Sequence, residues 1–501
     1  MYLLGYDAGT SSIKATLLEA QSGRVIASAT EPRREMEIIS RQPGWAEQDP
    51  YIWWENVKAA TARLRETAGV DLKDVEAIGI TYQMHGLVLV DTEGRVLRPA
   101  IIWCDNRAVS VGEQAAAELG AEKCLKHLLN LPGNFTLARI KWVKDHEPEI
   151  YARAYKALLP GDFIALKLTG QLQTTASGLS EWIGWDFQDG KPAAMLFNHF
   201  GIAPEIIPEI VPTFSVQGEV SKKAGGELGI RSGTKVAYRA GDQPNNAFSL
   251  KVLEPGEIAA TAGTSGVVYG IGDKPNYDDK SRVNTFLHVN HTPQAPRLGT
   301  LMCVAGTGCL NSWLKHNVMG EGRDYPQMNE LAEGIPVGSE GLVVIPYGNS
   351  AERTLENRDI GASIHGLQFA RHRRAHLLRA AQEGIVFGLN YGLQIMGQMR
   401  IKIETVRAGD ANMFLSPLFG KAFATITGAH VELYNTDGSQ GAARGAGIGA
   451  GIYKDCADAF RGLQKTRVIE PDNDLKNVYQ QAYARWEKVL QKELKPLSYR
   501  G

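Results

Sequence analysis

Two aspartates stand at the ends of apolar, strand-like segments and could carry acid–base or metal chemistry. Asp7 follows Leu3–Tyr6, and Asp242 follows Val236–Gly241. A carboxylate in such a position can hold Mg²⁺ beside a phosphate, or it can accept the proton of an attacking hydroxyl group. Each aspartate could also do no more than cap its own turn, for which Gly-Asp-Gln-Pro is suitable chemistry. The pair predicts a phosphoryl-transfer site, with Asp7 on the metal side and Asp242 as the base.

The tetrapeptide Ala-Gly-Thr-Ser occurs twice, at residues 8–11 and 262–265. Each copy lies between two apolar, β-prone segments, so we expect a strand–turn–strand hairpin around it. Glycine permits the tight turn, and bare N–H groups with Thr and Ser hydroxyls can cradle a phosphate. The repeat by itself is equally consistent with coincidence and with a duplicated phosphate loop. The candidate phosphate-binding residues are Gly9, Thr10, Ser11, Lys14, Gly263, Thr264 and Ser265.

A second set of residues could bind a small polyol. His85 lies in a loop after a predicted strand, where a ligand contact and a structural hydrogen bond are equally good explanations. Trp103 can place its indole face against C–H groups, while the charge of Asp105 can meet hydroxyl groups. Taken singly, each such residue is more common in a core or on a surface than in a site.

Composition excludes several other classes of protein. The chain has 501 residues, a formal net charge of −1 and five scattered cysteines. These values predict two or three domains and give no sign of nucleic-acid binding, of a disulfide framework or of a zinc site. Because no segment is apolar enough to cross a membrane and the N-terminus lacks a signal-peptide pattern, we expect a cytoplasmic protein.

Two nucleotide-binding motifs are also set aside. No Gly-x-x-x-x-Gly-Lys-Ser/Thr segment occurs, which excludes a P-loop enzyme. Residues 445–450 fit Gly-x-Gly-x-x-Ala, but they lie within a predicted small-residue helix instead of at a strand-to-helix turn. We interpret these glycines as the surface of a helix that packs closely on a sheet.

The predicted elements follow an α/β pattern in both halves of the chain. The first half is predicted to contain strands at 3–8, 12–19, 24–30 and 75–81, and helices from Pro50 to Gly69, at 135–144 and at 151–157. Pro255-Gly256 marks the domain boundary. The second half is predicted to contain strands at 404–408 and 431–434, and helices at 371–399, 416–427, 440–453 and 476–494. Each half opens with a hairpin that carries the repeated turn, and this shared plan favours a duplicated phosphate loop.

Several motifs, taken in order, resemble those of the FGGY carbohydrate kinases of the actin/hexokinase/heat-shock ATPase superfamily. The resemblance runs from about residue 1 to residue 451. Each motif is modest alone, whereas their common order is very specific. The motifs are Gly5–Ser11, Trp45–Pro50, Gln83–Gly86, Ile102–Arg107, Phe135–Trp142, Ala240–Asp242, Ala262–Gly266 and Ser416–Phe419.

The resemblance implies two ribonuclease H-like α/β domains that flank a deep cleft in which ATP and a sugar meet. The expected units are a sugar-binding domain at 1–250, a nucleotide-binding domain at 251–455 and a helical tail at 456–501 packed on the second domain. The resemblance implies that Asp242 is the catalytic residue and that Asp7 and Asp242 contact Mg²⁺. It implies phosphate contact for the two repeated turns and adenine contact for Gly409, Asp410 and Asn412. The implied sugar contacts are Met84, His85, Trp103, Asp105 and Gln243.

The Met84-His85 pair resembles that of pentulose kinases, whereas glycerol kinases carry Arg-Glu in the matching loop. This favours ATP-dependent phosphorylation of a ketopentose, most of all of D-xylulose to D-xylulose 5-phosphate. The chain departs from the family pattern at Arg239–Gly241, at Gly409-Asp410 and within Pro346–Arg353. The alternatives are a kinase for ribulose, another ketose, a polyol or a sugar acid, and a non-catalytic nucleotide-dependent binding protein on the same fold. A homodimer is one possible assembly, and neither nucleic acid nor a membrane is expected as a partner.

Overall fold

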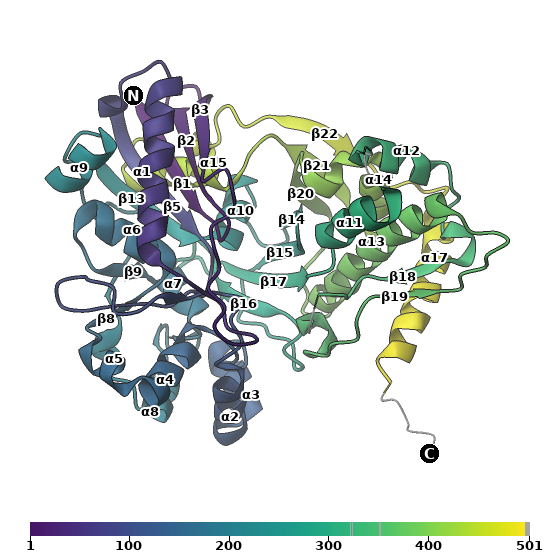
Figure 1. Cartoon of the computed structure of the whole chain (residues 1–501), viewed down its shortest axis with the longest axis horizontal. Coiled ribbons are helices and arrows are strands. Elements are labelled where there is room, and N and C mark those ends of the chain that lie inside the picture. The colour runs from purple at the N-terminus through teal and green to yellow at the C-terminus, as the bar shows by residue number, and fades with distance from the viewer. Residues whose placement is uncertain (321, 323, 350–351, 496–501) are drawn as a thin grey trace.

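Two β-sheets organise the chain, one built from each half (Figure 1). The computed structural model describes residues 1–320, 322, 324–349 and 352–495. Ser350 and Ala351 of the departing segment, and the last residues of the tail, lie outside this described part. The expected two-domain α/β class is confirmed.

The first sheet has the strand order β13-β5-β1-β2-β3. Neighbours β1, β2 and β3 are antiparallel, while β5 and β13 run parallel to β1. The carboxyl ends of β1, β5 and β13 therefore meet at one edge, which is where Asp7 and Asp242 lie. The strands are β1 (Tyr2–Ala8), β2 (Ile13–Glu19), β3 (Val25–Glu31), β5 (Val75–Tyr82) and β13 (Lys235–Gly241).

Helices and four small strand pairs surround this sheet. The helices are α1 (Pro50–Thr67), α2 (Val109–Leu119), α3 (Ala121–Leu128), α4 (Thr136–His146), α5 (Pro148–Arg153), α6 (Pro160–Thr169), α7 (Ala176–Glu181), α8 (Ala194–Phe200), α9 (Lys222–Leu228) and α10 (Asp242–Ser249). The strand pairs are β4 (Glu47–Gln48) with β7 (Ala100–Ile101), β6 (Val88–Val90) with β8 (Lys156–Leu158), β9 (Gln173–Thr175) with β12 (Glu209–Val211), and β10 (Trp185–Asp186) with β11 (Lys191–Pro192).

Local sequence accounts for most of these boundaries. At the start of α1, the Asp49 side chain accepts the Tyr51 N–H at 2.9 Å and Pro50 occupies the first helical position, as predicted. The helix predicted at 151–157 is wrong in its second half. There the chain becomes extended at Ala154, and β8 pairs with β6, so strand pairing overrides helix propensity.

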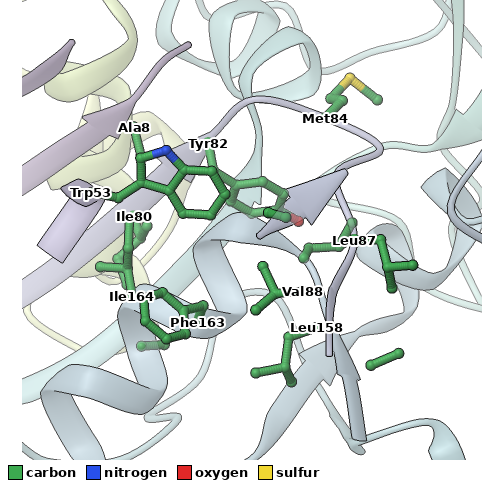
Figure 2. Close-up of a cluster of buried hydrophobic side chains, with 14 of the residues drawn as sticks. Ala8, Trp53, Ile80, Tyr82, Met84, Leu87, Val88, Leu158, Phe163 and Ile164 are labelled. Carbon is green, nitrogen blue, oxygen red and sulfur yellow. The ribbon is translucent and has the colours of Figure 1, made fainter. Parts of the chain in front are cut away.

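The core of the first half lies between its sheet and the covering helices. Figure 2 shows Trp53 of α1 and Phe163 of α6 beside Ile80 and Tyr82 of β5, all of them buried. Each large apolar side chain buried in this way stabilises the fold by roughly 1.5–3 kcal/mol. Gly161 of α6 packs directly on the Tyr82 ring, where a Cβ atom would overlap it.

The second sheet has the order β16-β17-β15-β14-β20-β21-β22. Its stretch β17-β15-β14-β20-β21 repeats the first sheet, since three antiparallel neighbours are followed by two parallel strands. The predicted duplication of plan is confirmed. The strands are β14 (Ile258–Ala262), β15 (Gly266–Gly272), β16 (Asn284–Leu287), β17 (Leu298–Val304), β20 (Thr405–Gly409), β21 (His430–Tyr434) and β22 (Lys465–Ile469), with a separate pair β18 (Val343–Ile345) and β19 (Ser363–His365).

The second half has its own helices, and one short stretch of it differs from expectation. Segment 456–501 was expected to be helical, but β22 within it is the edge strand of the second sheet. The predicted last helix is confirmed as α17, which buries one apolar face against α14 and β18. The helices are α11 (Gly308–Leu314) with a π-helical turn at Lys315–Met319, α12 (Tyr325–Glu333), α13 (Arg374–Gln398), α14 (Pro417–Thr427), α15 (Gly438–Gly449), α16 (Cys456–Ala459) and α17 (Lys476–Glu493).

Helix α15 belongs to the second half by sequence but packs on the first sheet (Figure 1). A Cβ atom on Gly5 of β1 would overlap the Ser439 carbonyl, and one on Gly79 of β5 would overlap that of Ala442. The interpretation of its small residues as a close-packing surface is confirmed. The domain limits at 250 and 455 stay a prediction. No helix in the described part of the chain is both long and apolar enough to cross a membrane.

Candidate active site

Asp7 has two further aspartates nearby at the carboxyl edge of the first sheet. Asp7 comes from β1, Asp242 begins α10, and Asp437 precedes α15. Gly438 approaches the Asp7 carboxylate so closely that a Cβ atom there would overlap it. Lys14 lies opposite Asp7 in the β1–β2 ladder and pairs with Asp437 Oδ2 at 2.8 Å. Lys14 therefore contacts Asp437 rather than standing free for a phosphate.

Burial shifts the acidities of these aspartates. It raises the pKa of Asp7 to about 7, with further increases from Asp242 and Asp437 and a decrease from Lys14. Burial likewise raises the pKa of Asp242 to about 6, although backbone and side-chain N–H groups of Gln243 oppose the shift. For Asp437 burial also acts upward, but Lys14 and hydrogen bonds outweigh it and lower the pKa. The group carries more negative charge than Lys14 neutralises.

This excess of carboxylate charge fits a divalent cation. No three His, Cys, Asp or Glu side chains in the described residues converge into a complete metal cage. Mg²⁺ does not need one, because it keeps water ligands and is usually held by one or two carboxylates together with phosphate oxygens. Asp7 and Asp242 supply carboxylates of the required kind.

His85 lies beside this edge as a neutral ring. Its Nδ1 lies 3.0 Å from the main-chain oxygen of Glu181, and the rings of Phe135 and Phe286 pack against it. A carbonyl oxygen can only accept, so Nδ1 carries the hydrogen and Nε2 is left as an acceptor. Burial, reinforced by Arg139, lowers the His85 pKa to about 3. The ring can accept a hydrogen bond from a hydroxyl group without becoming charged.

The first repeated turn is bonded to the loops that carry the predicted sugar ligands. The Thr10 hydroxyl donates to Gln83 Oε1 at 3.1 Å and accepts from the Trp103 indole N–H at 2.9 Å. Met84 is buried, and its Cγ would lie 2.7 Å from a Cβ atom on Gly241. Met84 therefore packs against the residue that precedes Asp242, while Trp103 reaches the turn.

Asp105 does not present a free carboxylate. It is fully buried, accepts the Ala46 N–H at 2.6 Å and forms an ion pair with Arg107 at 2.7 Å. Arg107 in turn stacks over Trp45. This geometry speaks against the predicted sugar contact and gives Asp105 a structural role, since its acceptor sites are occupied by loop partners.

A cavity of about 1050 Å³ lies in the second half of the chain. Gly263 and Thr264 of the second repeated turn line it, and Asn412 faces Gly263. Sequence reasoning missed most of its wall, which includes Trp313, His316, Tyr325, Asn329 and Met413. A cavity of this size, with exposed aromatic rings and amides, can hold a drug-sized ligand such as a nucleoside.

The two repeated turns line different hollows. Ser11 of the first turn lines a separate hollow of about 510 Å³ with Arg33 and Arg63. The second turn is backed by α11, since the N–H groups of Gly308 and Cys309 donate to the carbonyls of Gly263 and Thr264. Ser265 and Gly9 lie in their respective turns, and their phosphate roles stay predictions.

The predicted adenine loop is split by the structure. Asn412 lines the large cavity, whereas Asp410 accepts from Thr466 at 2.9 Å and pairs with Arg467. Gly409 ends β20 and is not part of the wall described for the cavity. Asp410 thus contacts β22, and its predicted adenine contact stays a prediction.

The two sheets share one topology, with carboxylates at the edge of the first and a large cavity beside the second. This arrangement is that of an actin/hexokinase-type two-domain kinase fold. Residues 2–249 match the model of the N-terminal domain of the FGGY family of carbohydrate kinases, and residues 258–452 match that of its C-terminal domain. The chain therefore belongs to the FGGY family, and it is a sugar kinase.

Curated relatives cover nearly the whole chain. Xylulose kinases of Bacillus subtilis and Staphylococcus epidermidis are 29% and 30% identical to it; the matches cover 92% and 99% of this chain and 91% and 97% of theirs. The L-xylulose/3-keto-L-gulonate kinase of Escherichia coli is 27% identical, with 98% of this chain and 96% of the relative covered. A crystal structure of a xylulose kinase from Brucella ovis superimposes with a TM-score of 0.87 at 28% identity, with 98% and 99% covered.

Proposed function

We propose that the protein transfers the γ-phosphoryl group of ATP to a primary hydroxyl of a ketopentose, most of all D-xylulose, to give D-xylulose 5-phosphate. The observation that carries this proposal is that Asp242 and a neutral His85 directly follow two residues that pack against each other, Gly241 and Met84. A carboxylate beside an uncharged hydrogen-bond acceptor suits a neutral, hydroxyl-rich substrate. Xylulose kinases among the relatives support the same substrate class.

In the proposed mechanism, Asp242 accepts the proton of the attacking hydroxyl as its oxygen forms the new bond to phosphorus. The bond between the γ-phosphorus and its bridging oxygen breaks, and ADP leaves. Gln243 holds the Asp242 carboxylate through its N–H groups. Asp7, with Asp242, would hold Mg²⁺, which supplies positive charge to the phosphates when bound. The cavity around Trp313 and Asn412 would take the nucleoside part of ATP.

A sugar acid is the second candidate substrate. Arg139 and Arg353 both lie close enough to His85 to lower its pKa, and positive charge there would favour an anionic sugar. The relative named for 3-keto-L-gulonate is almost as similar as the xylulose kinases. A non-catalytic nucleotide-binding role has no use for this sugar-side group.

The test is ADP release with a panel of D-xylulose, L-xylulose, ribulose, a polyol and a keto sugar acid. The proposal predicts the highest kcat/KM with D-xylulose. A keto acid as the best substrate would replace the ketopentose proposal, and silence with every sugar despite ATP binding would contradict the kinase mechanism.

A further inference from the structure

Glu181 is a buried carboxyl group next to the proposed base. It ends α7, none of it is exposed, and its only polar neighbours of opposite sign are the backbone N–H groups of His85 and Gly241, neither of which reaches full hydrogen-bond geometry with a carboxyl oxygen in the described residues. Buried carboxyl groups are normally paired or hydrogen-bonded, and an orphaned one often marks a functional site. The mechanism above makes no use of it.

The carboxyl group of Glu181 lies directly against Gly241, the residue before Asp242. A Cβ atom on Gly241 would overlap Glu181 Oε1 and lie 2.9 Å from its Cδ, while Met84 Cγ would lie 2.7 Å away on another side. Only glycine fits between these two side chains. The path of the chain into Asp242 is therefore set by Glu181 and Met84 together.

The main chain of Glu181 forms a hydrogen bond with His85, the second residue of the proposed sugar site. Its carbonyl accepts from His85 Nδ1 at 3.0 Å, which fixes the ring tautomer. His85 itself has a φ of 62°, an uncommon conformation for a side-chain-bearing residue. One residue thus contacts the peptide before the base and orients the histidine.

The surroundings of Glu181 favour its neutral form. Burial raises its pKa well above the ordinary value, and the carboxylates of Asp242 and Asp162 raise it further, while amides of His85 and Gly241 partly oppose this. Tyr82 and Tyr269 also face it and are uncharged near neutral pH. Arg239, which acts on Tyr82, is paired with Asp162 at 3.1 Å. None of the groups that shift the pKa of Glu181 is a cation.

Helix α7 is anchored to the opposite half of the molecule. Ser177 donates to the Leu287 carbonyl at 2.8 Å, and the Leu287 N–H donates to Ser180 Oγ at 3.0 Å. Leu287 belongs to β16 of the second sheet. Glu181 therefore belongs to a helix that is hydrogen-bonded to both halves of the molecule, and this limits the movement of Glu181.

We propose that Glu181 is a positioning residue for phosphoryl transfer: its carboxyl group supports the Gly241–Asp242 peptide, and its carbonyl holds the ring of His85. The proposal rests on the proposed function, because it assumes that Asp242 is the base. Support of this kind depends on the shape of the side chain and not on a negative charge.

The test compares Glu181→Gln, which keeps shape and neutrality, with Glu181→Asp and Glu181→Ala, which leave a void beside Gly241. Turnover with D-xylulose, or with the best sugar of the panel, is measured with both KM values. We expect Glu181→Gln to keep kcat within about threefold, while Glu181→Asp and Glu181→Ala lose about tenfold or more with an unchanged KM for ATP. If Glu181→Ala does not fold, Glu181→Asp against Glu181→Gln decides.

Either of two results would overturn the proposal. One is wild-type kcat in folded Glu181→Asp or Glu181→Ala; the other is a loss in Glu181→Gln as large as theirs, which would mean that a charge is required. Glu383→Gln is the matched control, since Glu383 is a buried carboxylate paired with Arg379 at 2.8 Å on α13, and its loss should lower thermal stability only. An active Asp242→Asn variant would instead refute the proposed function itself, so the two failures are distinguishable.

Discussion

The indole N–H of Trp103 donates a hydrogen bond to Thr10 Oγ1 at 2.9 Å, although 53% of Trp103 is exposed. This bond joins a loop of the proposed sugar site to the first repeated turn. Gln48 strengthens the link, because its side-chain amide donates to the Thr10 carbonyl at 2.8 Å. The turn is therefore held by the sugar-side loops rather than standing alone as a phosphate cradle.

Trp103→Phe tests this link, because it keeps an aromatic ring and removes the donor. A net hydrogen bond is worth about 0.5–1.5 kcal/mol, so we expect KM for the sugar to rise up to about tenfold with little change in melting temperature. Trp313→Phe is a matched control: Trp313 is also 53% exposed but lines the large cavity. It should raise KM for ATP instead, and a reversed pattern would refute both placements.

His85→Asn tests the neutral acceptor. Asparagine tolerates the left-handed backbone at residue 85, so the variant should fold, but it lacks an acceptor where Nε2 lies. We expect KM for the sugar to rise roughly 10–100-fold, the usual effect of leaving a substrate hydroxyl unpaired, with KM for ATP unchanged. Steady-state kinetics with each substrate varied would measure this. Equal changes in both KM values would point to a structural role for His85.

Asp7→Asn should remove activity and yet stabilise the metal-free protein. The folded state raises the pKa of Asp7 from 3.8 to about 7, so it binds the proton more tightly than the unfolded chain does. The stabilisation that comes from this tighter proton binding is fully present below the unfolded pKa and is lost as pH rises toward 7. In neutral, metal-free buffer the ionised group is thus unfavourable, and we expect Asp7→Asn to gain about 1–3 kcal/mol, after allowance for partial exposure.

Asp437→Asn supplies the opposite control. Its pKa is lowered in the folded state, so the ionised carboxylate stabilises the protein above the unfolded pKa and its loss should lower the melting temperature. Thermal unfolding with and without Mg²⁺ would check both variants. A destabilised Asp7→Asn protein in metal-free buffer would contradict the proposed excess of negative charge.

With Mg²⁺ at saturation, which keeps Asp7 ionised, the pH dependence of kcat/KM for the sugar follows from Asp242. A protonated Asp242 cannot accept the hydroxyl proton, so activity should fall as pH is lowered through about 6. His85, with its pKa near 3, does not contribute to this decline. The decline should therefore stay at the same pH in His85→Asn. A decline that moved with that substitution would assign it to the histidine.

Sequence alone predicted the elements that local chemistry determines. The Asp49 cap, the glycine-rich surface of α15 and the two hairpins follow from residue type and spacing, and all are present. The helix predicted at 151–157 was wrong in its second half because β8 depends on a strand partner that is distant in sequence. The small residues of α15 predicted close packing, but not that it would cross to the first sheet.

Part of the candidate site could not be read from the chain, for the same reason. Asp437 and Glu181 reach the edge of the first sheet only through the packing of α15 and α7, and neither lies in a recognisable motif. Conversely, Asp105 lies in a family motif, but its charge is taken up by Arg107. Residue type indicated which side chains could act, whereas tertiary packing decided which of them are free to do so.

The most direct test of the central claim is turnover of purified Asp242→Asn with ATP and D-xylulose, or with the best sugar of the panel. Asparagine keeps the shape of the side chain and cannot accept the proton. We predict a loss of roughly 10²–10⁴-fold in kcat, the usual contribution of a general base, with no loss of thermal stability and with retained ATP binding. Turnover near the wild-type rate would contradict the assignment of Asp242 and the mechanism built on it.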